Sequence, residues 1–161
     1  MVTEQKILEW LEEVKDPEIP VLSLIDLGVI QKVDIATDQS VRVTMTPTFS
    51  GCPAMDVMKQ DVEDTLEKNG IDNYEVCVSF ETPWNSERIS DKGRAALKEF
   101  GLAPPPKNTL IVDIDVLSKV SCPFCDSNNT RLTTPFGPTL CRSMHYCDNC
   151  KQAFEQFKPV E

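Results

Sequence analysis

The stretch VRVTMTPTFSGCPAMDVMKQDVEDTL, residues 41–66, contains the two patterns that decide the fold. Its first six residues, Val41 to Thr46, alternate between apolar and polar side chains, which predicts a half-buried β-strand. Its last part spaces apolar residues as one face of a helix does: Met55, Val57, Met58, Val62 and Leu66. Pro47 ends the strand, and the loop that follows leads to Pro53, a residue suited to the first turn of a helix. We therefore expect a strand, a loop and a helix in succession.

Further strands and helices are predicted on both sides of this stretch. A strand over residues 29–35 would form a hairpin with residues 41–46, and the alternation over residues 74–80 predicts a third strand. Helical spacing predicts an amphipathic helix before Asp16-Pro17 and another over residues 89–100. Residues 21–28 are too short and interrupted to assign. These elements indicate an α+β fold, with a small mixed sheet and helices packed on one side of it.

The run Pro104-Pro105-Pro106 marks the best candidate domain boundary, because consecutive prolines form a stiff, extended spacer. Residues 109–116 alternate like a strand after this spacer. We therefore expect a first domain over residues 1–103, a linker with a connecting strand over residues 104–118, and a second module over residues 119–161.

Four of the seven cysteines form two C-x-x-C pairs in the second module. The pairs are Cys122-Pro123-Phe124-Cys125 and Cys147-Asp148-Asn149-Cys150, separated by 21 residues. Two such pairs can supply the four sulfurs of a tetrahedral zinc site, about 2.3 Å from the metal. The segment between the pairs has the length of a β-hairpin. The spacing predicts a zinc ribbon whose closed site is structural rather than reactive; iron fits the same four sulfurs, and spacing alone does not separate the two metals.

The other cysteines have different settings. Cys52 follows Ser50-Gly51 in the loop and precedes the expected helix start, where backbone N–H groups and the helix dipole favour a thiolate. A lone cysteine is as often a small buried apolar residue, so both interpretations stay open. Cys77 lies in the middle of a strand and is expected to be structural. Cys141 and His145, the chain's single imidazole, are not assigned as ligands.

Several polar residues could support a site near Cys52. The hydroxyls of Thr46, Thr48 and Ser50 could donate hydrogen bonds to a thiolate or a bound anion. The carboxylates of Asp16, Glu18 and Asp26 lie in a segment punctuated by proline and glycine. For these carboxylates, capping and turning the chain is the simpler explanation.

The formal net charge is −10 and the isoelectric point is about 4.6. Residues 1–118 carry a net charge of −11 and residues 119–161 a net charge of +1. Such a field repels phosphate backbones and anionic lipids, so neither nucleic acid nor a membrane is an expected partner. The N-terminal residues lack the apolar stretch of a signal peptide, and no later segment has the apolar length of a membrane span. We therefore expect a reducing, cytoplasmic setting, in which clustered cysteines indicate metal binding.

Two groups of motifs resemble a known family. The runs DPEIP at residues 16–20, DLGVI at 26–30 and TPTFSGCPA at 46–54 are similar to the metal–sulfur cluster assembly domain shared by SufT and the cytosolic iron–sulfur targeting factors. Trp84, the run ISDKGR at residues 89–94, the run FGLAPP at 100–105 and the C-terminal cysteine pairs resemble the PaaD family, the accessory subunits of phenylacetyl-CoA epoxidase. The resemblance covers nearly the whole chain, although Asp126 and Lys151 stand where glycine usually follows a cysteine pair.

The resemblance implies an accessory protein rather than an enzyme. It implies a role in maturing the iron or iron–sulfur centres of the epoxidase's oxygenase and reductase subunits, in phenylacetate catabolism. It implies that Cys52 is a transient ligand of iron or of an iron–sulfur cluster, and that the zinc-bound ribbon docks a client subunit. Homodimer formation stays open. Two alternatives remain: a rubredoxin-like electron carrier that holds iron in the four cysteines, and a zinc-ribbon protein that binds nucleic acid.

Overall fold

The computed structural model describes residues 1–49, 51–107 and 120–159, and the chain divides into two compact units. The first unit contains residues 1–84 and 88–93, and the second contains residues 85–87 and 94–161. The strand expected over residues 109–116 lies outside the described residues. The domain boundaries expected from the sequence stay a prediction.

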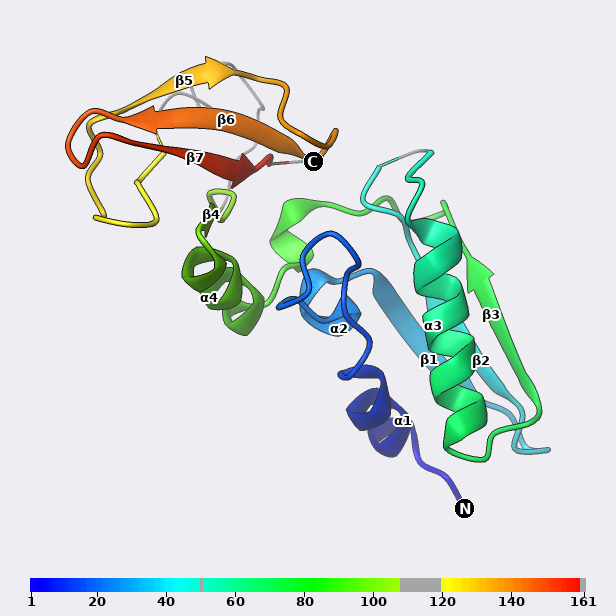
Figure 1. Cartoon of the computed structure of the whole chain (residues 1–161). Helices are drawn as coiled ribbons and strands as arrows, with labels where there is room; N and C mark the ends of the chain where they lie inside the picture. Colours follow the sequence, from blue (N-terminus) through cyan, green and yellow to red (C-terminus); the bar gives the residue numbers. More distant parts are fainter. Residues whose placement is uncertain (50, 108–119, 160–161) are drawn as a thin grey trace. The chain divides into compact units, whose positions relative to one another are not determined.

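The first unit contains a three-stranded mixed sheet in the order β1-β2-β3 (Figure 1). Strands β1 (Ile30–Ile35) and β2 (Val41–Met45) form the expected antiparallel hairpin, and β3 (Tyr74–Val78) pairs with β2 in parallel. The backbone N–H of Ala36 donates to the carbonyl of Ser40 at 2.9 Å and closes the hairpin turn. Side chains alternate between the two sides of the sheet along each strand. Val33, Val43 and Val76 are buried on the covered side, and their neighbours along each strand face the other side.

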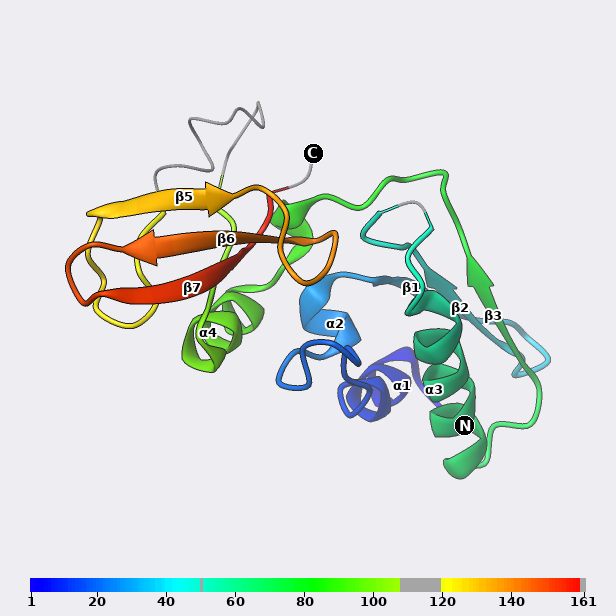
Figure 2. The ribbon, with the colours of Figure 1, turned by 45° about the horizontal axis from the view of Figure 1, so that its top comes forward.

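Helices cover the buried side of this sheet (Figures 1 and 2). Helix α1 (Glu4–Leu11) contacts β1, and α3 (Met55–Lys68) links β2 to β3 and contacts β3. The two helices also contact each other. The helical spacing was wrong for Val57 of α3, which is 50% exposed and lies outside the buried face. The buried apolar residues of both helices lie at the predicted helical spacing. These residues are Ile7, Leu11, Met55, Met58, Val62 and Leu66. Because a parallel pair needs a crossover connection, α3 provides both the link between the strands and the cover of the sheet.

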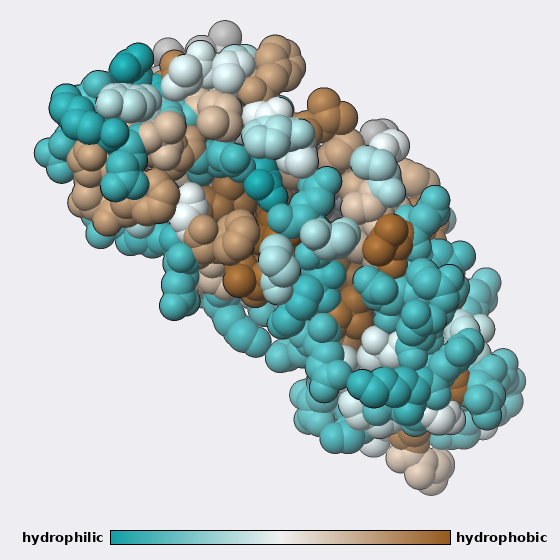
Figure 3. Space-filling model, in the orientation of Figure 1, coloured by the Kyte–Doolittle hydropathy of each residue, from teal (hydrophilic) through white to brown (hydrophobic). Residues whose placement is uncertain are grey.

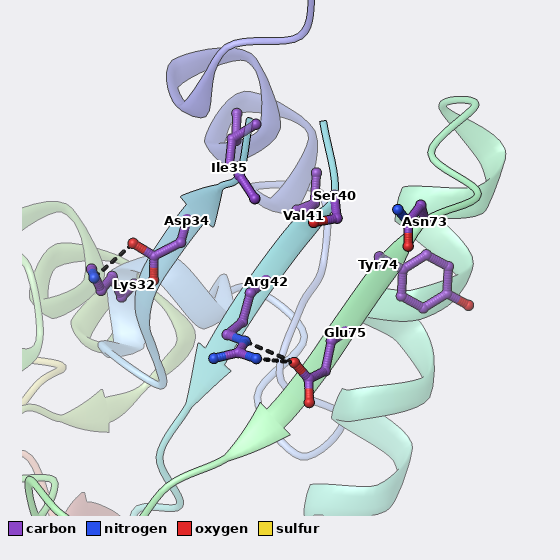
Figure 4. A pocket seen from close by; sticks show the side chains of 10 residues that line it. Lys32, Asp34, Ile35, Ser40, Val41, Arg42, Asn73, Tyr74 and Glu75 are labelled. Carbon is purple, nitrogen blue, oxygen red and sulfur yellow. Dashed lines mark hydrogen bonds and ion pairs between the residues drawn. The ribbon is translucent and has the colours of Figure 1, made fainter. Parts of the chain in front are cut away.

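The uncovered side of the sheet is polar. Lys32 Nζ lies 2.6 Å from Asp34 Oδ1, and Arg42 Nη2 on β2 lies 2.7 Å from Glu75 Oε2 on β3. Figure 4 shows both ion pairs. The pairs lie along a shallow cavity of about 560 Å³. Because each lysine or arginine here has its own carboxylate, the groups satisfy one another and do not single out a ligand.

A short helix that the sequence did not predict, α2 (Leu24–Leu27), follows the N-terminal turns. Ser23 caps its start by accepting a hydrogen bond from the N–H of Asp26 at 3.0 Å. Gly28 ends it with φ +77°, and a Cβ there would approach the Cβ of Arg88 to 2.5 Å. Gly28 is therefore required both by the backbone conformation and by the close approach of Arg88.

Two further helices follow β3. They are the 3₁₀ turn η1 (Ser86–Arg88) and helix α4 (Asp91–Phe100). Before them, the buried indole of Trp84 donates a hydrogen bond to the carbonyl of Leu27 at 2.8 Å. This bond ties the chain after β3 to α2. Among the described residues, no helix is both long and apolar enough to cross a membrane.

The second unit contains a four-stranded sheet in the order β4-β7-β6-β5. Strands β5 (Thr130–Thr134), β6 (Arg142–Cys147) and β7 (Gln152–Phe157) are antiparallel, and the two-residue β4 (Leu102–Ala103) pairs with β7 in parallel. The hairpin expected between the two cysteine pairs is confirmed as β5–β6. One buried cluster beside these strands includes two of the four paired cysteines: Ala103, Val120, Cys122, Cys147 and Phe154.

Candidate functional site

The four cysteines of the two C-x-x-C pairs converge on one point in the second unit. Cys147 is the last residue of β6, and Cys150 lies in the turn between β6 and β7. Their sulfurs meet those of the first pair: Cys122 Sγ lies 3.7 Å from Cys150 Sγ, and Cys125 Sγ lies 3.6 Å from Cys147 Sγ. All four sulfurs lie within 4.8 Å of one another. A tetrahedron with metal–sulfur distances of about 2.3 Å has edges of about 3.8 Å, so the four sulfurs fit one zinc or iron ion.

The backbone of each knuckle turns in a left-handed conformation directly after its second cysteine. Asp126 has φ +59° and Lys151 has φ +60°. In the first knuckle, the N–H of Asp126 donates to the carbonyl of Cys122 and the N–H of Cys122 donates to the carbonyl of Ser127, both at 2.9 Å. Glycine adopts this conformation most easily. Asp126 and Lys151 therefore adopt the left-handed backbone conformation that glycine would adopt more easily, and each does so at a conformational cost.

Full ionisation of the four thiols would require a cation between them. The side-chain amide of Asn149 donates a hydrogen bond to Cys125 Sγ at 3.5 Å and lowers the pKa of that thiol to about 6. Burial and the neighbouring cysteines raise the pKa of Cys150 to about 12. Four thiols this close cannot all ionise without a positive ion between them. Once all four are bound, no open position remains for a substrate.

His145 lies on β6, the strand that ends at Cys147, and Cys141 directly precedes that strand. Neither residue belongs to the four-sulfur group. His145 is fully buried, stacks on Phe154 with ring centres 5.3 Å apart, and shares a hydrogen bond of 2.9 Å between its Nε2 and the hydroxyl of Ser143. Burial lowers the pKa of His145. Cys141 Sγ lies 3.0 Å from the hydroxyl of Thr139. In the described parts of the chain, the four-cysteine set is the one cluster of three or more potential metal ligands.

Cys52 lies in the first unit, in the loop between β2 and α3. The loop leaves the sheet where the parallel strands β2 and β3 end, beside the start of α3 (Figure 1). Such carboxyl ends of parallel strands are where ligands bind in many α/β sheets. Cys52 is half-buried, and Gly51 before it has φ +78° with open space around its Cα. Pro53 lies in the turn before α3 rather than in its first helical turn, because the helix begins at Met55.

The hydroxyls expected beside Cys52 have different positions. Thr46 is buried, and its hydroxyl donates to the carbonyl of Thr82 at 3.3 Å. Thr48 is half-buried in the loop, and Ser50 lies outside the described residues. No cluster of three potential metal ligands that contains Cys52 occurs among the residues that the structure describes. A supporting role for these hydroxyls stays a prediction.

The N-terminal carboxylates hold the chain around α2. Asp16 Oδ1 accepts hydrogen bonds from the N–H groups of Glu18 at 2.8 Å and Ile19 at 2.9 Å. Asp26 is buried and accepts hydrogen bonds from the hydroxyls of Ser23 at 2.9 Å and Ser90 at 2.6 Å. Burial alone would raise the pKa of Asp26, but these hydrogen bonds and the ammonium of Lys92, 3.5 Å away, hold it below its ordinary value. These contacts are those of capping and anchoring groups; a role beside Cys52 stays a prediction.

Comparisons with known proteins match two different families to the part of the chain that contains Cys52 and to the part that contains the four-cysteine cluster. Residues 4–77 match the family described as iron–sulfur cluster assembly protein, and residues 110–158 match the PaaD zinc beta ribbon domain. A protein of Escherichia coli K12, provisionally named as a subunit of 1,2-phenylacetyl-CoA epoxidase, is 32% identical over 155 residues, which cover 96% of this chain and 92% of that protein. The chain belongs to the PaaD family. In this PaaD-family chain, Cys52 lies within the residues that match the assembly family, and all four clustered cysteines lie within the residues that match the zinc ribbon domain.

Shorter relatives match the N-terminal part of this PaaD-family chain. An iron–sulfur protein maturation auxiliary factor of Porphyromonas gingivalis is 40% identical over 100 residues, which cover 62% of this chain and 91% of that protein. A solved structure of a DUF59 domain of unknown function from Bacillus anthracis is 33% identical and matches with a TM-score of 0.55, covering 58% of this chain and 90% of that chain. The assembly domain thus also occurs without a zinc ribbon.

Two residues of the PaaD ribbon were not singled out by the sequence. Asn149 donates to Cys125, and its place directly before a cysteine of the second pair was an available signal. Gln156 is 1% exposed, whereas Gln152 of the same strand is exposed, and the sequence does not distinguish the buried amide from the surface one. Its contacts arise only in the folded chain.

Proposed function

We propose that this chain is an accessory factor that helps to mature iron or iron–sulfur centres of a multicomponent phenylacetyl-CoA epoxidase. Cys52 serves as a transient ligand for iron or a cluster, which is cargo rather than a resident cofactor. The ribbon holds one structural zinc ion and docks a client subunit, which is an oxygenase or reductase subunit. The chain itself carries out no turnover chemistry.

The observation that carries this proposal is the similarity along the whole chain. The Escherichia coli relative is named as an epoxidase subunit, and the relatives of the N-terminal part are named as iron–sulfur protein maturation factors. The same two modules, in the same order, are present here. A protein that combines them fits a factor that brings an assembly function to one particular client.

The loop geometry supports Cys52 as the working thiol. Its half-buried position gives a partial shield from solvent while leaving part of the side chain accessible. Gly51 allows another backbone or a ligand to approach closely, because a Cβ added there would meet nothing within 4 Å. When the thiol binds iron it loses its proton, and the bond is reversible enough to let the cargo pass on.

The four-cysteine site supports a structural metal. Four thiolates occupy every position of a tetrahedral ion, which leaves none for transfer chemistry. Two of these cysteines belong to a buried cluster of the second unit, so a bound metal would contribute to the folding energy of that unit. We therefore assign zinc to the ribbon and iron to the cargo.

The proposal predicts a loss of client maturation in Cys52→Ala. The variant and the client subunits are produced together in cells, and epoxidase activity and client iron content are measured. We expect both to fall to the level seen without this chain, because the transient ligand is missing. Cys77→Ala, a thiol of β3 that lies 3.6 Å from the hydroxyl of Thr44, is the matched control and should leave both unchanged. Unchanged client iron in Cys52→Ala would refute the proposal.

Anaerobic purification and counting of zinc, iron and sulfide separate the alternatives. One zinc ion in both wild type and Cys52→Ala, with extra iron in wild type alone, supports the two assigned roles. A coloured protein with one iron ion in place of zinc would favour the rubredoxin-like electron carrier, because the same sulfur tetrahedron holds either metal.

A further inference from the structure

The four-cysteine cluster contains two cysteines that solvent reaches and two that it does not. Cys125 and Cys150 are half-buried, whereas Cys122 and Cys147 are 0% exposed. Each knuckle therefore contributes one accessible and one enclosed thiol. Because an oxidant acts on the thiolates that it can reach, Cys125 and Cys150 are the two points at which the cluster is open to attack.

Each accessible cysteine contacts an enclosed cysteine of the other knuckle. Cys125 Sγ lies 3.6 Å from Cys147 Sγ, and Cys150 Sγ lies 3.7 Å from Cys122 Sγ. A cysteine that is oxidised to a sulfenic acid condenses with a thiol that it meets. These contacts place a second thiol beside each point of attack, and in both cases that thiol belongs to the opposite knuckle.

Contacts that involve no metal also hold the two knuckles side by side. The backbone N–H of Asp148 in the second knuckle donates to the carbonyl of Asn129, just after the first knuckle, at 2.9 Å. Arg131 Nε lies 3.3 Å from Asp148 Oδ2. The side-chain amide of Asn149 reaches across to Cys125 Sγ at 3.5 Å. The knuckles therefore have their own reasons to stay together while the sulfurs exchange a metal for one another.

We propose that the four-cysteine cluster is a peroxide-sensitive switch that gives up its metal and closes into two disulfides, Cys125–Cys147 and Cys122–Cys150. Both disulfides join one knuckle to the other. This inference goes beyond the proposed function, in which the metal of the ribbon is structural. It depends neither on Cys52 nor on a client subunit, so its test is separate from the test of iron transfer.

The electrons for this step come from sulfur. An accessible thiolate attacks the O–O bond of hydrogen peroxide and becomes a sulfenic acid, while hydroxide leaves. The enclosed thiolate across the cluster then attacks that sulfur, forms the S–S bond and displaces a second hydroxide. Four thiolates and two molecules of peroxide thus give two disulfides and four hydroxide ions. A divalent ion that has lost its four thiolate ligands dissociates.

The disulfides replace the metal as the closure of the ribbon. They enclose the hairpin β5–β6 in covalent loops, and such loops stabilise a fold by restricting the unfolded chain. The oxidised ribbon therefore stays folded without a metal. Reduction by a dithiol then returns the four thiols in place, ready to bind a metal again.

The test treats the full, zinc-loaded chain with hydrogen peroxide and maps the disulfides by mass spectrometry after alkylation of free thiols. Trypsin separates the two knuckles, because it cuts the sequence after Lys119, Arg131, Arg142 and Lys151. We expect peptide 120–131 to be linked to peptide 143–151 by two disulfides, with fragmentation between the cysteines assigning the two proposed pairs. A zinc indicator should record one ion released for every two molecules of peroxide consumed, and dithiothreitol with added zinc should restore the loaded form.

Matched controls make each outcome decisive. Cys141→Ser and Cys52→Ala, which remove thiols outside the cluster, should give the same linked peptides and the same zinc release. Amide hydrogen exchange should show that β6 keeps its protection in the oxidised chain and loses it in the reduced chain treated with a chelator. The inference is wrong if each peptide carries its own internal disulfide, if peroxide leaves the zinc bound, or if oxidation exposes β6 as much as chelation does.

Discussion

Lys151 shows how the ribbon keeps its knuckle geometry without glycine. Its φ of +60° lies in the left-handed region, as does that of Asp126 in the first knuckle. For residues with a side chain this conformation costs roughly 1–2 kcal/mol. The convergence of the four sulfurs stabilises the turn enough to offset that cost.

This cost predicts that Lys151→Gly stabilises the ribbon. Relief of the left-handed conformation exceeds the extra chain entropy that glycine loses on folding, so the free energy of unfolding should rise by about 0.5–1 kcal/mol. Urea unfolding of the metal-bound protein measures it. Lys158→Gly removes the same kind of side chain at a position without positive φ and should be destabilising instead. A lower midpoint for Lys151→Gly would contradict this account of the knuckle.

Residue-level reasoning from the sequence identified the four clustered cysteines because ligand spacing is local. It could not separate the two interpretations of the carboxylates. Asp26 is held by Ser23, three residues away, but also by Ser90, sixty-four residues away, and a partner that distant leaves no local signal. The burial of Gln156 was equally invisible, because this residue is paired with β4 on one side and with β6 on the other.

At the scale of elements, the sequence predicted those with their own periodicity. The hairpin β1–β2, helix α3 and strand β3 lie where alternation and helical spacing placed them. Two short elements were not predicted. Helix α2 has four residues and β4 has two, so neither completes a recognisable period. Both are stabilised by contacts made elsewhere, such as the bond from Trp84 to the carbonyl of Leu27.

Separate cores predict that the two sheets respond differently to metal removal. A chelator should unfold β5, β6 and β7, because metal binding supplies about 10–16 kcal/mol in small zinc modules, while β1, β2 and β3 stay folded. Amide hydrogen exchange, resolved by strand, measures this. Cys147→Ser should reproduce the effect, and Cys141→Ser, a cysteine outside the cluster, should not. Loss of protection in the first sheet, or its retention in the second, would argue against metal-dependent folding of the ribbon alone.

At the scale of the whole chain, charge is distributed unevenly. The first unit carries the entire formal charge of −10 and the second is neutral. The face drawn in Figure 3 is largely hydrophilic over α1 and α3. This acidity disfavours nucleic acid as a partner of the first unit.

The closed four-sulfur site also changes the charge of the molecule when it is filled. Four thiols lose their protons to a divalent ion, so zinc loading adds two negative charges to the formal −10, whereas ferric iron adds one. Native gel electrophoresis at about pH 8 should therefore resolve three bands, with the zinc form migrating fastest toward the anode and the metal-free form slowest. Treatment with a chelator should slow the zinc band. Identical positions with and without metal would mean that the cysteines do not bind as four thiolates.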